Sequence, residues 1–417
     1  MTTRVKHVNE LRLLDVIIIG AGPAGNLAAL NIAKAGFSVE VYDWRTKIGD
    51  KLCTGIIGHS CFKEFPPAEN DIYRSSSSAN IVSPSGKTYL INHRNPQAYV
   101  INRISYVKSF ADKAIQLGAI YRLNEKVISI DISDSKVSVI SETKAGNHTA
   151  NCKAVIIATG FGSPLLKMAG LGNGGHKNFL TGCQTTVSTD GLSRPTVFLG
   201  SNIGRGSFGW LVPTQNNEAL LGLATSRKLN GDMDNLTKLL KSKGYYNKIE
   251  SPQRKWGIPV KPSTPTYSQR ALSIGDAAGL TKPTTGGGIY YSLLSGQLAA
   301  KTLIQALNQG DLSSKQLKPY ESEWKKILNN EIKLGNIARG IFESLRDSQI
   351  DFLISKLMTD DVRKDVLEAT GVSFDWHGRI INSAFMHSVF GKYLSLVTPE
   401  LEEKSADIKS KGPIEVA

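Results

Sequence analysis

A glycine-rich turn near the N-terminus constrains the fold of this chain more than any other feature. The stretch Asp15-Val-Ile-Ile-Ile-Gly-Ala-Gly-Pro-Ala-Gly25 joins a short apolar strand to an Ala-rich segment that ends at Ala35. In this context Gly-x-Gly-x-x-Gly predicts a turn that only glycine permits, followed by a helix N-terminus that can hold a pyrophosphate. Asp43 ends the next apolar strand, 23 positions past Gly20, where a carboxylate commonly binds a ribose hydroxyl. The pattern therefore predicts a dinucleotide site.

The bulk composition is that of a soluble globular protein with room for two or three packed regions. The chain has 417 residues, of which 41% are hydrophobic and 21% charged. No apolar run approaches the roughly 20 residues that span a bilayer, and the N-terminus lacks the apolar core of a signal peptide. The cysteines show no metal-ligand spacing: Cys53, Cys61, Cys152 and Cys183. We therefore expect a cytoplasmic protein with no metal site.

The net charge of +14 limits the classes of partner. Nucleic acid is not expected, because no zinc, homeodomain or RNA-binding motif accompanies the charge. A basic surface also attracts anionic lipids, so peripheral contact with a membrane is one interpretation. Solubility alone explains the charge equally well.

Further along the chain, the sequence alternates between two kinds of pattern. Apolar strands ending in glycine return at 154–160 and 271–279, and helices are predicted from Arg103 to Leu117 and from Ile289 to Asn308. Short strands with Gly, Pro and Asn turns fill 181–226, which indicates an inserted antiparallel sheet. The expected division is a discontinuous nucleotide-binding domain (1–70, 98–165 and 270–310), a substrate-binding β domain (71–97 and 166–269) and a C-terminal helical region (311–417) with a frayed tail past Pro399.

Three separated pieces of the chain resemble one family. The first glycine turn with Asp43, the strand ending in Ala158-Thr-Gly160, and Gly275-Asp276 are similar to FAD-dependent oxidoreductases of the p-hydroxybenzoate hydroxylase structural group. Within that group the chain resembles the geranylgeranyl reductases, which saturate double bonds of prenyl chains on archaeal lipids or on chlorophyll. The signatures are Lys51-Leu-Cys-Thr-Gly55, Phe208-Gly-Trp-Leu-Val-Pro213 and Lys282-Pro-Thr-Thr-Gly-Gly-Gly-Ile289, and the likeness spans about residues 13–310.

The resemblance implies an α/β fold. A Rossmann-like FAD-binding domain of the glutathione-reductase-2 type would carry an inserted antiparallel substrate sheet and a C-terminal helical region. It also implies a set of FAD contacts: Gly20, Gly22, Ala24, Gly25, Asp43, Thr54, Gly55, Arg103, Val127, Asp276, Gly287, Gly288 and Ile289. For Asp276 the alternative is a helix cap. The triple glycine before Ile289 would direct a positive helix end toward the isoalloxazine.

On the substrate side, the resemblance points to Cys53 as the catalytic residue, in a loop where substrate meets flavin. Its thiol would line the pocket or relay a proton, although a small buried cysteine is the commoner case. Phe208, Trp210 and Pro213 would contact the isoprenoid, with a place in the core as an equal alternative. Val212 and Ala224 stand where the family usually has Phe and Gly.

The implied activity is reduction of C=C bonds in geranylgeranyl chains, most simply those of archaeal-type membrane lipids. The isolated alkene is a poor electrophile, so the protein must supply dryness, alignment and a proton. Two other flavoprotein classes stay open: an FAD-dependent monooxygenase, disfavoured because Thr159 stands where hydroxylases carry Asp, and a FixC-like electron-transfer flavoprotein, disfavoured because no ferredoxin-like cysteine cluster is present. The sequence leaves NADPH and reduced ferredoxin open as electron donors.

Overall fold

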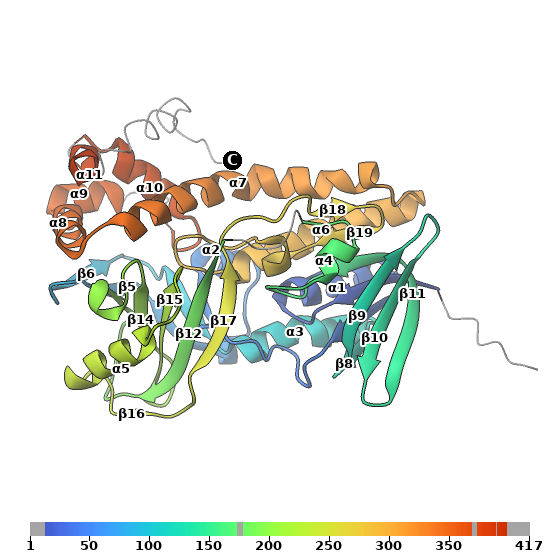
Figure 1. Ribbon diagram of the computed structural model, residues 1–417, viewed down its shortest axis with the longest axis horizontal. Coiled ribbons are helices and arrows are strands. Elements are labelled where there is room, and N and C mark those ends of the chain that lie inside the picture. Colours follow the sequence, from blue (N-terminus) through green and yellow to red (C-terminus); the bar gives the residue numbers. More distant parts are fainter. Residues whose placement is uncertain (1–12, 173–177, 369–372, 389, 398–417) are drawn as a thin grey trace, which may run out of the picture.

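The computed structural model describes residues 13–172, 178–368, 373–388 and 390–397. Figure 1 shows two large sheets at opposite ends of the long axis, with the long helix α7 (Ser314–Ser344) running across both of them. The mixed α/β architecture expected from the sequence is therefore present. The frayed tail expected past Pro399 lies outside the described residues, as do residues 173–175 of the glycine-rich loop that begins at Gly170.

The first sheet has a parallel centre. Its strand order is β18-β19-β11-β1-β2-β8, and the β9–β10 pair extends from β11. Ile18 pairs in parallel with both Ile156 and Val41, as expected for apolar runs that are covered on both faces. The strands are β1 (Leu13–Ile19), β2 (Val39–Asp43), β8 (Ile120–Leu123), β9 (Lys126–Ile132), β10 (Val137–Thr143), β11 (Gly146–Ile157), β18 (Tyr267–Ser268) and β19 (Ala271–Ser273).

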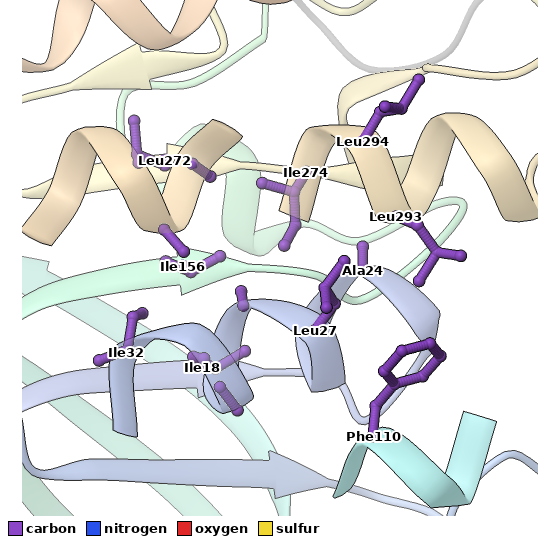
Figure 2. Packing of buried hydrophobic residues seen from close by; sticks show 14 of the residues in the cluster. Ile18, Ala24, Leu27, Ile32, Phe110, Ile156, Leu272, Ile274, Leu293 and Leu294 are labelled. Carbon is purple, nitrogen blue, oxygen red and sulfur yellow. The ribbon is translucent and has the colours of Figure 1, made fainter. Parts of the chain in front are cut away.

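Three helices cover one face of this sheet: α1 (Pro23–Lys34), α3 (Arg103–Gln116) and α6 (Ile289–Gln309). Figure 2 shows Leu27 of α1 and Leu293 of α6 pointing into the same apolar layer as Ile156 of β11. A Cβ on Gly296 would lie 2.5 Å from the carbonyl oxygen of Ala24. Glycine at this position therefore lets α6 approach α1 closely.

The second sheet is mainly antiparallel, in the order β16-β12-β15-β14-β13-β5-β6, with β17 also paired to β12. Successive side chains of its strands alternate between the two faces of the sheet. Leu211, Leu221 and Leu223 pack against α5 (Asp232–Ser242), whereas Trp210 and Val212 belong to a cluster on the other face. The strands are β5 (Ser78–Val82), β6 (Thr88–Asn92), β12 (Phe179–Ser188), β13 (Thr196–Leu199), β14 (Phe208–Pro213), β15 (Glu218–Thr225), β16 (Lys248–Ile249) and β17 (Arg254–Pro259).

The remaining elements join the two sheets. A small sheet is formed by β3 (Ile56–Gly58), β7 (Ala98–Ile101) and β4 (Ile72–Ser76). The C-terminal helices pack against one another and against β5 and β6 through a separate apolar cluster that includes Ile81 and Ile91. The other helices are α2 (His59–Glu64), α4 (Leu165–Met168), α8 (Asp347–Leu357), α9 (Asp360–Val366), α10 (His377–Met386) and α11 (Phe390–Val397), with short 3-10 turns at Glu69–Asp71, Ser201–Ile203 and Gly275–Ala278.

Two local features differ from the sequence expectation. The strand expected to begin at Ala154 begins at Gly146, because its first half pairs antiparallel with β10 before its second half pairs parallel with β1. The segment 71–97 contributes to two sheets, since β4 pairs with β7 while β5 and β6 join the second sheet. The proposed division into domains stays a prediction.

Candidate active site

A large cavity of about 1310 Å³ lies between the two sheets and is lined by residues from both of them. This volume exceeds the 300–1,000 Å³ typical of a site for one small molecule, so there is room for a cofactor and a second ligand. Its walls are the glycine turn after β1, the loop around Cys53, the loop before α6, one face of the second sheet and a C-terminal segment.

The first glycine turn has a different steric reason for each glycine. Gly20 has φ +114°, and a Cβ there would lie 2.2 Å from the carbonyl oxygen of Ala158. A Cβ on Gly25 would lie 2.0 Å from the oxygen of Gly20, so Gly25 lets helix α1 pack on the turn and does not itself line the cavity. A Cβ on Gly22 would meet no atom within 4 Å, and this residue lines the cavity. Because α1 has no side-chain cap, its N–H groups are available to an anion.

Asp43 is held rigidly at the same end of the cavity. One carboxylate oxygen accepts the Ala21 N–H at 2.8 Å, and the other accepts the Arg45 N–H at 2.8 Å. The residue is buried yet lines the cavity. Val127 lines it as well. The turn, the acidic residue and Val127, all predicted from the sequence, therefore come together at one end.

Arg103 fastens the loop that carries Cys53. At the start of α3 its guanidinium donates to the carbonyl oxygens of Gly49 and Lys51. Burial lowers the pKa of Arg103, but an arginine stays charged at neutral pH. Further along the loop, the Gly55 N–H donates to the Cys53 sulfur at 3.5 Å. Cys53, Thr54 and Gly55 all line the cavity.

A second glycine-rich turn precedes α6 on the opposite wall. Gly287, Gly288 and Ile289 line the cavity, and the helix start at Gly288 has no side-chain cap. Asp276 lies beside it, because a Cβ on Gly288 would be 3.0 Å from an Asp276 oxygen. Asp276 caps no helix of the described ranges and instead forms an ion pair with Lys51. The helix end and the ion pair form a polar wall suited to a charged ligand.

These residues fit FAD. The hydroxyl oxygen of Thr159 is buried on the cavity wall and has no hydrogen-bond partner among the described residues. A buried polar atom of this kind calls for a ligand or water. Together with the open Gly22, the oriented Asp43 and the two uncapped helix starts, it matches a dinucleotide with a pyrophosphate, a ribose and a flavin ring. No group of His, Cys, Asp and Glu in the described ranges could hold a metal ion.

The C-terminal segment was missed by the sequence reasoning, yet it lines the cavity through Phe374 and His377. Lys282, at the start of the second glycine turn, donates to the Phe374 carbonyl at 2.8 Å and lies 3.8 Å from the Asp375 carboxylate. Asp375 in turn accepts N–H groups of Gly58 at 3.2 Å and Cys61 at 3.0 Å. A buried ion pair therefore joins the second turn, helix α2 and the C-terminal segment.

His377 contributes a neutral ring to this wall. Its Nδ1 hydrogen-bonds the Thr284 hydroxyl. Burial and the nearby Lys282 charge lower its pKa to about 3. The ring therefore stays uncharged at neutral pH and adds no positive charge to this wall of the cavity.

The aromatic motif on β14 divides between the two faces of the sheet. Phe208 and Trp210 line the cavity, with ring centroids 5.8 Å apart. Pro213 lies on the opposite face and is not among the lining residues, whereas Val212 is. Trp256 of β17 also lines the cavity, with its ring 6.4 Å from that of Trp210. Because side chains alternate between the two faces of a strand, the sequence already implied that Trp210 and Val212 share one face and that Pro213 lies on the other.

Comparisons with known proteins agree with this geometry. Residues 14–204 match the family described as pyridine nucleotide-disulphide oxidoreductase. A digeranylgeranylglycerophospholipid reductase of Methanococcoides burtonii is 26% identical, with 88% of this chain and 93% of that protein covered. One of Methanosphaerula palustris is 29% identical, with 75% and 81% covered.

Solved structures show the same fold. A geranylgeranyl bacteriochlorophyll reductase-like protein from Thermoplasma acidophilum superposes with a TM-score of 0.82 at 22% identity, covering 95% of this chain and 99% of that one. The p-nitrophenol 4-monooxygenase of Pseudomonas putida gives 0.69 at 16% identity, covering 85% and 96%. A halogenase solved in complex with FAD gives 0.65 at 15% identity. The expected fold class is thereby confirmed, and the cavity has the residues that the expected FAD cofactor requires. The chain is thus similar over most of its length to digeranylgeranylglycerophospholipid reductases.

Proposed function

We propose that this protein reduces C=C bonds in the geranylgeranyl chains of an archaeal-type membrane phospholipid. The observation that carries the proposal is the single cavity, which runs from two glycine-rich turns to the aromatic face of the second sheet, with Cys53 between them. The relatives named for digeranylgeranylglycerophospholipid support this substrate class. A monooxygenase shares the fold, but no feature of this cavity favours it over the reductase.

The protein's part in the reaction is alignment and exclusion of water. A bound FAD, once reduced by the electron donor, would supply the hydride, and a proton would complete each saturated bond, so that each double bond gains two hydrogens. Phe208, Trp210 and Trp256 offer an apolar wall along which a prenyl chain can lie. Cys53 faces the same space and, in this proposal, contacts the chain at the reacting carbons. Its thiol is the proposed proton carrier, since a dry pocket needs an internal one.

Two partners are proposed on weaker grounds. A lipid substrate requires access to a bilayer, and the +14 charge suits peripheral contact with anionic headgroups. No helix of the described ranges is long and apolar enough to cross a membrane. Reduced ferredoxin and NADPH are both retained as electron donors, and turnover with each donor separately distinguishes them.

The test begins with purified protein loaded with FAD. The flavin is reduced anaerobically with dithionite, and a geranylgeranylated phospholipid is then added. We expect the flavin to reoxidise and the lipid to gain two mass units per double bond. A flavin that reoxidises only with oxygen, giving a hydroxylated or epoxidised product, would contradict the reductase and favour the monooxygenase.

Cys53 is tested by paired variants. Cys53→Ala removes the thiol, and we expect reoxidation by lipid to slow by roughly 10²-fold, as for loss of a general acid. Cys53→Ser keeps a proton-bearing group and should be less impaired. Cys183→Ala is the matched control, because Cys183 is buried against α5, away from the cavity. Equal rates for Cys53→Ala and the control would leave Cys53 as a wall residue only.

A further inference from the structure

One row of the second sheet places three residues side by side. Gln184 of β12 pairs with Gly222 of β15, and Gly222 pairs on its other side with Trp210 of β14. Neighbouring strands lie about 4.8 Å apart, so Gln184 and Trp210 are separated by the width of one intervening strand. Contact between their side chains requires the residue between them to be small.

Gly222 provides that space. A Cβ at this position would lie 2.5 Å from the Cζ2 atom of the Trp210 ring, closer than any side chain allows. The indole therefore extends across the intervening strand, and its N–H donates to the Gln184 side-chain oxygen at 3.2 Å. The spacing between the aromatic motif and Gly222 thus has a structural reason, since it sets the hairpin register that aligns the two residues.

The same oxygen of Gln184 also holds the loop that carries Cys53. It accepts the Thr54 hydroxyl at 3.0 Å, and Thr54 follows Cys53 in the loop that closes this side. Gln184 is only 2% exposed and is not itself a lining residue. A single buried amide oxygen therefore ties the cysteine loop to the tryptophan of the substrate sheet.

We propose that Gln184 is a positioning residue that fixes the separation of Cys53 and Trp210 and so determines which double bond of a prenyl chain reaches the reacting position. This inference rests on the proposed function and deepens it. Residues of the glycine turns hold the FAD and do not include Gln184. Loss of the amide should therefore alter substrate alignment more than FAD affinity, which it can change only through the Thr54 contact.

Losing the Gln184 amide removes the acceptor of two buried hydrogen bonds. Replacement by an apolar side chain leaves the Thr54 hydroxyl and the Trp210 N–H without an acceptor, which buried polar groups rarely tolerate. The indole and the loop then move to find other partners. A misplacement of about 1 Å can cost on the order of 10²-fold in rate, so turnover is a sensitive readout.

The structural arm of the experiment observes the indole directly. In protein labelled with 15N at tryptophan, the Trp210 N–H signal is assigned by its absence in Trp210→Phe. Gln184→Met has a similar shape without the acceptor, and we expect it to shift this signal upfield. Gln184→Glu keeps an acceptor oxygen and should restore it. Thr186→Val, two residues along the same strand, is the matched control and should leave the signal in place.

The kinetic arm measures lipid reduction by the same proteins. We expect Gln184→Met to lower kcat at least tenfold, with a smaller change in KM and in FAD affinity, and to change the distribution of partly reduced products. Gln184→Glu should recover most of kcat. Native kcat and products in Gln184→Met, with the indole signal unmoved, would overturn the inference.

A second variant keeps the test decisive if Gln184→Met fails to fold. Gly222→Ala breaks the same hydrogen bond from the other side, by pushing the indole away, and should reproduce the shifted signal and the lower kcat. If wild-type protein reduces no prenyl lipid, the proposed function fails. The indole signal still reports whether Gln184 holds Trp210, so the two failures are distinguishable.

Discussion

The two glycine-rich turns on the cavity wall reach the same kind of geometry by different means. The turn after β1 is held by backbone sterics within a short stretch and its neighbouring strand, as the close approach of Gly20 to Ala158 shows. The turn before α6 is held by distant side chains. Lys282 reaches Phe374, 92 positions away, and Arg339 of α7 donates to the Pro283 carbonyl at 3.4 Å.

The two turns should therefore be disrupted by different kinds of substitution. A local turn fails when a side chain is added, because no atom can move aside. A turn held by buried charges fails when one charge loses its partner, because the remaining charge must stay buried unpaired. The first kind of turn is sensitive to shape and the second to electrostatics and pH.

The largest effect is expected at the first turn. Gly20→Ala adds a Cβ 2.2 Å from the Ala158 oxygen at φ +114°, and we expect the variant to lose bound FAD. Gly36→Ala is the control, because Gly36 also has positive φ, +84°, but its Cβ meets nothing within 4 Å. The control should cost only about 1 kcal/mol of unfolding free energy. Flavin content after gel filtration and urea unfolding measure both, and FAD retention in Gly20→Ala would contradict the steric account.

The next effect is expected at the buried ion pair. Asp375→Ala leaves the Lys282 ammonium buried without its carboxylate, and we expect a loss of about 3–5 kcal/mol in unfolding free energy. Lys282→Met combined with Asp375→Asn should cost less than Asp375→Ala alone, because no unpaired charge remains. Glu323→Ala breaks an exposed pair with Lys326 and should cost much less than Asp375→Ala. Urea unfolding at fixed FAD concentration gives all three values, and equal losses at both pairs would refute the contrast.

A smaller effect is expected from acid. The pKa of His377 is lowered to about 3 in the folded protein from the ordinary 6.5, so between these values only the unfolded chain binds the proton. Stability should therefore fall as the pH drops below about 6.5, by roughly 2 kcal/mol, since the partly exposed ring does not bear the full burial penalty. His377→Gln should flatten this slope, whereas the exposed His148→Gln should retain it. Urea unfolding across the pH range is the measurement.

The two turns also differ in how far the sequence could predict them. The first turn and Asp43 could be predicted because the motif that reveals them lies within a few dozen residues. The ion-pair partner of Lys282 could not be predicted, since nothing near Lys282 in the sequence indicates Asp375. Gln184 was missed for the same reason, because its role depends on strand register. Pro213 is different, because alternation along β14 already places it away from Trp210.

The smallest effect is expected at the residue that lies between both turns. Lys51 pairs with Asp276 beside the second turn, and its ammonium lies 4.0 Å from the Cβ position of Gly160, which follows β11. The pair is partly exposed, so salt screens it and its energy is modest.

Because FAD brings a pyrophosphate to these walls, Lys51→Met should weaken FAD binding by up to about tenfold, since Asp276 then faces the anion unpaired. Adding Asp276→Asn should recover part of the affinity, and the exposed Lys47→Met should change nothing. Titration with FAD at low and high salt separates the charges from the shape of the turns, because a loss of affinity that persists unchanged at high salt would mean that Lys51 acts through packing.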